Sequence, residues 1–476
     1  MNLIYKPEDR PKFGNCILYA FQQLLAIVAA TIAVPAIVGN GMTASAALFG
    51  AGVGTLVYQL FTKFRSPVFL GSSFAFLGSM FAAFAGAASV SIGYVGLIVG
   101  AVFAGLVYVV LALIVKFAGV KWIDKLMPPV IIGPIVAIIG LSLAGNAIGD
   151  MTSAGYLGLV CALVTLFTVI ISSVYGTKGM KLVPFIIGIG AGYVLALILS
   201  ATGAAPLIDF AKFKEIDGVF GSPGFSFVKA WEGLRQIDLT YILTIFFAYA
   251  PVAFVVFAEH LADHKNLSSI IGRDLTQDPG LHRTLLGDGI GSMAGAFFGG
   301  CPNTTYGESI GCVAITGNAS VITITTTAAL AIAVSFFKPL MVVLDSIPAC
   351  VMGGVCMTLY GFIAVSGLKM LQPVDLNKNG NLFTASVILI AGVGGLSLSF
   401  ATGMGDITIT TVACALILGI ITNLIVRRKN YNHCKEKKNC GHTDDKYGGC
   451  KFADENGECT AGLCINREYR SIWRNE

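Results

Sequence analysis

The chain has 476 residues, of which 55% are hydrophobic and only 12% are charged, and its mean hydropathy is +0.79. A soluble domain carries about 25% charged residues, so this composition excludes a soluble globular protein and indicates an integral membrane protein. The formal net charge of +5 is accounted for by basic residues in loops on one side of the membrane, and no nucleic-acid partner is implied.

Apolar windows of about 20 residues, the length that crosses a hydrocarbon core of about 30 Å, recur along the chain. Two further segments, near 68–85 and 303–317, are apolar but are interrupted by small and polar residues, and counting them gives fourteen spans. The clear spans are predicted at 15–38, 43–62, 91–116, 128–148, 155–176, 182–202, 239–262, 284–300, 319–345, 348–367, 382–400 and 407–426.

The orientation follows from the charges. The first fifteen residues, MNLIYKPEDRPKFGN, are charged and run into the first span without a cleavage site. Lysines and arginines fall on the same side of the membrane in a fourteen-span count, so both termini are expected to be cytoplasmic.

The two interrupted segments resemble each other. SSFAF at 72–76 and TTYGE at 304–308 each place a hydroxyl pair before an aromatic residue, and PPVIIGPIVAIIGLSLAG at 128–145 matches PACVMGGVCMTLYGFIAVSG at 348–367 in its prolines and glycines. This spacing suits two repeats of seven spans, and an odd number of spans makes the second repeat inverted. Discontinuous helices at matched positions predict a substrate site near the middle of the membrane.

Glu308 is the only charged residue between Asp288 and Lys338. An ionisable group inside a membrane segment costs several kcal/mol unless it is paired or functional, so we interpret Glu308 as a binding residue. The alternative is a structural carboxylate that caps the half-helix beginning after it, and the two interpretations are compatible.

Glu259 and Asp263 are four residues apart and therefore share one face of a helix. Two carboxyl groups so placed could share protons, although an acid at the membrane interface is the alternative for Glu259. His260 and His264 are expected to meet headgroups or water. Asp288 fits either a partner inside the helix or a residue at its boundary.

Gln22 and Gln23 lie in the first span and can both donate and accept hydrogen bonds. In the predicted repeat their positions correspond approximately to those of Glu259 and His260 in the second half.

Seven runs of residues, in matching order, resemble the nucleobase–ascorbate transporter family in its uracil permease branch. The resemblance extends from the first span to the last and leaves out only the tail. The runs are FQQLLAIVAATIAVP at 21–35, LGSSFAF at 70–76, AEH at 258–260, TQDPGLHR at 276–283, PNTTYGESIG at 302–311, PACVMGG at 348–354 and VDLNKNGNL at 374–382.

The resemblance implies an all-α integral membrane protein of fourteen segments in two inverted seven-span repeats, with spans 3 and 10 broken by short β-strands that cross. It implies a membrane domain at 1–426, with a core at about 14–118 and 239–345 and a gate at about 119–238 and 346–426. Its substrate would be a nucleobase, uracil first, imported across the cytoplasmic (inner) membrane with a proton and without a cofactor. Lipid is the remaining partner, and assembly as a homodimer is left open.

Carried across by motif, the residues that hold the base are Phe74, Glu259, Gly307 and Glu308. The residues expected to couple a proton are Glu259, Asp263 and Glu308. A carboxylate would accept from the N–H groups of uracil, and backbone amides or a protonated carboxyl would donate to its carbonyl groups.

Three residues depart from the uracil permease pattern. Gln23 replaces a histidine, Asp263 stands where uracil permeases have a histidine, and Gly317, like Asp263, resembles the purine members. A purine (xanthine or urate) carrier and sodium coupling therefore stay open. An embedded enzyme is disfavoured, because no nucleophile–base pair or metal quartet lies among the spans, and a channel is disfavoured because broken helices suit alternating access.

The tail at 427–476 is charged and rich in cysteine, and a cytoplasmic location argues against stable disulfides there. Its cysteine spacing fits no zinc ribbon, so metal binding, redox sensing and the absence of a discrete function all stay open. The five tail cysteines are Cys434, Cys440, Cys450, Cys459 and Cys464.

Overall fold

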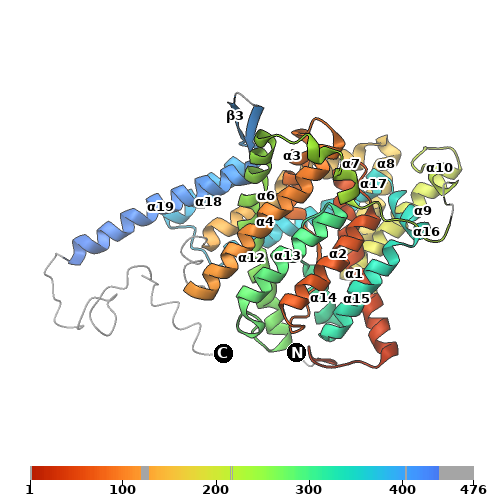
Figure 1. The fold of residues 1–476 in the computed structure, drawn as a ribbon, viewed down its shortest axis with the longest axis horizontal. Coiled ribbons are helices and arrows are strands. Elements are labelled where there is room, and N and C mark those ends of the chain that lie inside the picture. The colour runs from red at the N-terminus through yellow and green to blue at the C-terminus, as the bar shows by residue number, and fades with distance from the viewer. Residues whose placement is uncertain (1–2, 120–127, 215, 217, 403–404, 439–476) are drawn as a thin grey trace.

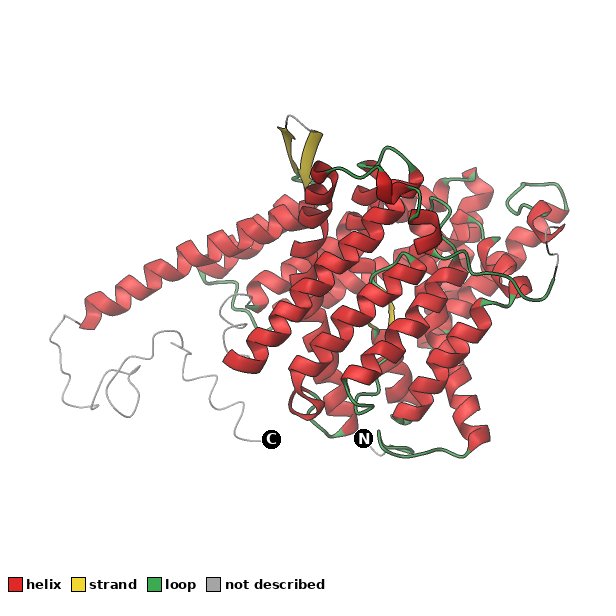
Figure 2. Ribbon diagram, in the orientation of Figure 1, coloured by secondary structure: helices red, strands yellow, loops and turns green. Residues whose placement is uncertain are grey.

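A computed structural model of the protein describes residues 3–119, 128–214, 216, 218–402 and 405–438, which form a bundle of helices with a few short strands (Figures 1 and 2). Within the described residues, eight helical segments are long and apolar enough to cross a membrane. They are α1 (Phe13–Val38), α2 (Ala44–Phe61), α4 (Val90–Ala118), the consecutive helices α6 (Pro129–Ser142) and α7 (Ala144–Thr152), α8 (Gly155–Val174), α9 (Pro184–Ala201), α12 (Leu239–Ile271) and α17 (Ala349–Leu371).

Further helices complete the bundle. Several of them are apolar and correspond to the remaining predicted segments. They are α3 (Leu77–Ala85), α13 (Leu281–Gly299), α14 (Gly307–Thr316), α15 (Val321–Ser335), α16 (Lys338–Asp345), α18 (Asn379–Val393) and α19 (Thr411–Lys438), with the small α10 (Ala211–Lys214) and α11 (Ser226–Ala230) in the long connection before α12.

Several predicted boundaries are wrong. Helix α12 continues to Ile271 instead of ending at 262, so Glu259 is not close to its end. The predicted span 319–345 is divided into α15 and α16, because Pro339 occupies the first turn of a new helix. The predicted span 382–400 is helical only to Val393.

After α18 the chain forms a hairpin that the sequence analysis did not predict. Strand β3 (Leu398–Thr402) pairs antiparallel with β4 (Gly405–Ile409), and the hairpin projects at the end of the bundle opposite the N-terminus (Figure 1). Gly394 and Gly395 precede it, and residues 405–410 read GDITIT, whose alternating β-branched residues favour a strand over a helix.

The two interrupted segments meet as a two-stranded sheet, as the resemblance implied. Strand β1 (Leu70–Ser72) pairs antiparallel with β2 (Asn303–Thr305), with Gly71 opposite Thr304, and all six residues are buried. A Cβ at Gly71 would lie 2.3 Å from the ring of Tyr306, so only glycine fits there. The 3-10 turn η1 (Phe74–Phe76) and α3 follow β1, whereas α14 follows β2.

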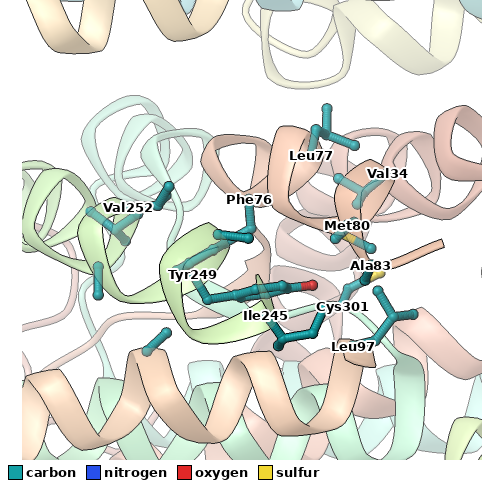
Figure 3. Packing of buried hydrophobic residues seen from close by; sticks show 14 of the residues in the cluster. Val34, Phe76, Leu77, Met80, Ala83, Leu97, Ile245, Tyr249, Val252 and Cys301 are labelled. Carbon is teal, nitrogen blue, oxygen red and sulfur yellow. The ribbon is translucent and has the colours of Figure 1, made fainter. Parts of the chain in front are cut away.

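The apolar packing around this crossing is dense (Figure 3). Phe76 of η1 stacks on Tyr249 of α12 with ring centroids 5.5 Å apart, and Met80 of α3 and Leu97 of α4 belong to the same buried cluster. The crossing strands are thereby held against α12, the helix that carries Glu259.

Helices α2 and α13 approach closely through glycine. A Cβ at Gly50 would lie 2.4 Å from the carbonyl oxygen of Gly295, and one at Gly291 would lie 2.7 Å from that of Gly54. Small residues four apart allow membrane helices to pack backbone against backbone, and this contact fixes α13 behind β2.

Replacing Gly50 with alanine is expected to lower the stability of the folded protein by about 1–3 kcal/mol, because the methyl group must push two backbones apart. Thermal unfolding of the purified protein in detergent measures this effect. Gly190→Ala on α9, where a Cβ meets no atom within 4 Å, is the matched control and should leave the melting temperature unchanged or slightly raised. Equal melting temperatures for both variants would contradict the packing.

The N-terminal arm crosses the end of α14. The backbone N–H of Ile4 donates to the carbonyl of Gly317 at 2.8 Å, and that of Ala319 donates to the carbonyl of Tyr5 at 2.9 Å. Gly317 ends α14 with a φ of +68°, a left-handed conformation that favours glycine at a helix C-terminus. The residue that resembles the purine members therefore has a structural role as a helix cap.

Candidate binding site

The predicted site residues come from three elements that converge. Phe74 begins η1, Glu259 and Asp263 lie on α12, and Gly307 and Glu308 form the first turn of α14. Helix α12 packs against η1, β2 and α14, so the fold brings together side chains that are far apart in the sequence.

The beginning of α14 is open. Gly307 is exposed although Thr305 of β2 and Ser309 of α14 are buried, and a Cβ placed on it would meet no atom within 4 Å. The first N–H groups of a helix have no acceptor within the helix, and the residue before α14, Tyr306, makes no side-chain cap. This helix end therefore presents hydrogen-bond donors to an open space. The Glu308 carboxyl group beside them accepts from its own backbone N–H, which agrees with the capping role weighed in the sequence analysis.

Carboxyl groups gather next to this space. Glu259 interacts electrostatically with Asp263 on its own helix, with Glu308 from α14 and with Asp288 from α13. Asp263 accepts a hydrogen bond of 2.6 Å from the Thr305 hydroxyl, which ties α12 to β2. Glu259, Asp263 and Glu308 are all half-buried, so they are reachable from the open space and still shielded from bulk water.

The expectation that His260 and His264 meet headgroups or water is wrong, because both side chains are completely buried. His260 contacts Asp288 through Nδ1 at 2.7 Å and the Thr284 hydroxyl through Nε2 at 3.0 Å. His264 donates from Nδ1 to the His260 carbonyl at 2.8 Å, and its Nε2 lies 2.8 Å from the Tyr58 hydroxyl. Asp288 is thus a partner inside the bundle and not a boundary residue.

Gln23 supports the first turn of α14. Its side chain is buried, and Nε2 donates to the carbonyl of Ser309 at 3.2 Å and to the Ser309 hydroxyl. Gln22 is half-buried, and its Oε1 has no hydrogen-bond partner among the described residues. The predicted repeat matched these glutamines with the positions of Glu259 and His260, and it did not predict the contact of Gln23 with Ser309.

Phe74 connects the strand crossing with α17. Its half-buried ring meets Tyr360 edge to face, with centroids 6.3 Å apart and planes at 77°. Neither Tyr360 nor Thr305 was predicted as a site residue, although Thr305 belongs to the run TTYGE that contains Glu308.

In the part of the chain that the structure describes, no group of three or more His, Cys, Asp or Glu side chains is arranged to hold a metal ion. The tail cysteines fall outside that part: Cys440, Cys450, Cys459 and Cys464 lie beyond residue 438, and the side chain of Cys434 is not described.

Solved structures with the same fold are membrane transporters. The transmembrane domain of a cyanobacterium bicarbonate transporter, BicA, superposes with a TM-score of 0.59 at 16% identity, covering 88% of this chain and 100% of that one. The murine anion transporter Slc26a9 in its inward-facing state gives a TM-score of 0.60 at 13% identity, covering 89% of this chain and 70% of that one. The chain therefore has the fold of these membrane transporters.

Sequence relatives give the family. Residues 14–400 match the model of a permease family. The uracil permease of Bacillus caldolyticus is 39% identical over 426 residues, and that of Bacillus subtilis (strain 168) is 37% identical over 430 residues; each alignment covers 88% of this chain and 94% of the relative. The uracil permease of Escherichia coli (strain K12) is 35% identical over 433 residues, with the same coverage. The chain belongs to this permease family, the nucleobase–ascorbate transporters.

Proposed function

We propose that the protein imports uracil together with a proton by alternating access. The observation that carries the proposal is the cluster of Glu259, Asp263 and Glu308 at the open N-terminus of α14, in a chain whose relatives along 88% of its length include uracil permeases. Glu308 accepts from the N–H groups of the base, and protonated Glu259 and the N–H groups that begin α14 at Gly307 donate to its carbonyl groups. The backbone at Phe74 closes the site from the side of β1.

The proposal includes the architecture that the resemblance implied. Fourteen spans form two inverted repeats of seven, with the core at about 14–118 and 239–345 and the gate at about 119–238 and 346–426. The antiparallel pairing of β1 with β2, each followed by a short helix, supports the repeat. The contact between Phe74 of the core and Tyr360 of the gate lies where the two domains would move past each other. Both termini face the cytoplasm, the membrane is the cytoplasmic (inner) one, and assembly as a homodimer stays open.

A purine base is the second candidate substrate, and Asp263 is the residue that favours it. Gly317, which pointed the same way in the sequence, is accounted for by its left-handed backbone at the end of α14. The relatives compared above are uracil permeases, so uracil is the first choice.

Uptake of labelled uracil by proteoliposomes tests the function. Uptake should rise with an inward proton gradient and collapse with a protonophore. Uptake that follows a sodium gradient at constant pH would show that sodium, and not the proton, is the coupling ion. Chemical conversion of the base would indicate an enzyme. A binding panel of uracil, xanthine, urate and ascorbate decides the substrate.

Replacing Gly307 with alanine is expected to weaken uracil binding about tenfold, because the methyl group occupies the space where the base would approach the helix N-terminus. The fold should persist, since the methyl group meets no protein atom within 4 Å. Isothermal titration of the purified variant measures the affinity, with Gly190→Ala as the control. Unchanged affinity would place the base elsewhere.

Deleting residues 427–476 is expected to leave uptake largely intact, because the predicted spans are complete at residue 426. Uptake per inserted molecule, compared with that of the full chain, is the measurement. Loss of uptake in a correctly inserted truncated protein would assign the tail a part in transport or in its regulation.

A further inference from the structure

A small cavity lies beside Asn303, the first residue of strand β2. Its volume is about 10 Å³, roughly the space that one water molecule needs. Its polar lining comes from Tyr108 on α4, Asp288 and Ser292 on α13, and Asn303 on β2, and the rest of the lining is apolar or glycine.

Three buried polar atoms that lack a hydrogen-bond partner among the described residues belong to this lining. They are the Tyr108 hydroxyl, Oδ1 of Asp288 and Oδ1 of Asn303, and the three residues are 4%, 1% and 2% exposed. A buried polar group without a partner costs about 1–3 kcal/mol, so three of them around one cavity need a common partner.

The remaining contacts of these residues fix what each atom can offer. Asp288 already uses Oδ2 for His260, at 2.7 Å, and leaves Oδ1 as an acceptor. Asn303 donates from Nδ2 to the Gly50 carbonyl at 3.0 Å, which leaves its Oδ1 as a second acceptor. Ser292 Oγ accepts the backbone N–H of Asn303 at 2.9 Å and keeps its own hydrogen to donate, as does the Tyr108 hydroxyl.

We infer that the cavity binds one ordered water molecule, which donates to Asp288 and Asn303 and accepts from Tyr108 and Ser292. Two acceptors and two donors match the hydrogen-bonding capacity of water. A metal cation fits this lining poorly, because an octahedral site takes about six oxygen ligands and the hydroxyl hydrogen of Tyr108 would be left without an acceptor.

The water joins α4, α13 and the beginning of β2. Asn303 begins β2, and two residues later Thr305 donates to Asp263. The water therefore positions β2, and Tyr108 and Ser292 act on the site through it without contacting the substrate.

The test compares Tyr108→Phe with Tyr249→Phe in the full chain. Tyr249 is also a buried tyrosine whose hydroxyl has no hydrogen-bond partner among the described residues, but it does not line the cavity. An experimental structure that resolves buried solvent should show one peak in the wild type, at about 2.8 Å from each of the four polar groups. Hydrogen exchange in a peptide containing residues 303–305 should become faster in Tyr108→Phe and stay unchanged in Tyr249→Phe.

Uracil affinity should fall about fivefold in Tyr108→Phe. This affinity measurement is the only part of the test that rests on the proposed function. If the wild type binds no uracil, the proposed function fails. The solvent density and the hydrogen-exchange rates still show whether the cavity holds a water molecule. Should Tyr108→Phe not fold, the solvent density of the wild-type structure decides the inference by itself. An empty cavity in the wild type, a cation in it, or equal exchange in the two tyrosine variants would overturn the inference.

Discussion

Glu308→Gln is expected to weaken uracil binding by about a hundredfold while the protein stays folded. The carboxylate of Glu308 only accepts hydrogen bonds, whereas the amide of glutamine also carries an NH₂ donor. In the variant the N–H group of the bound base loses its charged acceptor and faces this NH₂ group instead. Glu308 is half-buried at an open helix end, and its carboxyl group accepts a hydrogen bond from its own backbone N–H. Binding of labelled uracil to the purified, monodisperse variant measures the effect.

The control for this variant is Glu232→Gln, which makes the same chemical change at an exposed glutamate in the connection before α12. It should bind as the wild type does. Wild-type affinity in a folded Glu308→Gln protein would remove Glu308 from the site, and loss of binding in both variants would point to a general effect on the protein.

The second prediction with a large effect concerns the proton. Uracil binding should tighten as the pH falls from about 8 to about 6 in the wild type and should become independent of pH in Glu259→Gln. Shielding from water disfavours the charged form of a carboxyl group, and a neighbouring carboxylate disfavours it further. Glu259 is faced by Asp263, Glu308 and Asp288, so a proton on this cluster relieves repulsion.

The sign follows from linkage. If the protonated form of Glu259 donates to a uracil carbonyl and the ionised form repels it, proton and base each tighten the binding of the other. Lower pH then strengthens binding. Replacing Asp263 with asparagine removes one neighbouring charge, which lets Glu259 lose its proton at lower pH and moves the pH dependence of binding downward.

The measurement is uracil affinity as a function of pH for the wild type, Glu259→Gln and Asp263→Asn. Because Asp263 also accepts from the Thr305 hydroxyl, Thr305→Val is the control that removes this hydrogen bond without removing the charge. It should weaken binding without moving its pH dependence. The same pH dependence in all four proteins would show that this acidic pair does not hold the coupled proton.

The sequence by itself determined the class of the protein and most of its helices, and it predicted the principal residues of the candidate site. Composition is sufficient for the class, because about 20 apolar residues per span are needed whatever the fold. The broken segments and Glu308 were predicted because a small polar run and a lone acid are costly in a membrane and stand out against apolar neighbours. The four-residue spacing of Glu259 and Asp263 placed both on one helical face.

Only the tertiary structure decided how the helices face one another. In a soluble protein the polar face of a helix marks the solvent, but in a membrane the faces toward lipid and toward other helices are both apolar, so the pattern carries little information about orientation. For this reason the burial of His260 and His264, the contact of Gln23 with Ser309 and the cavity beside Asp288 could not be predicted. Each depends on which neighbour a side chain meets, and that is set by the packing of α2, α13 and α14 around the two crossing strands.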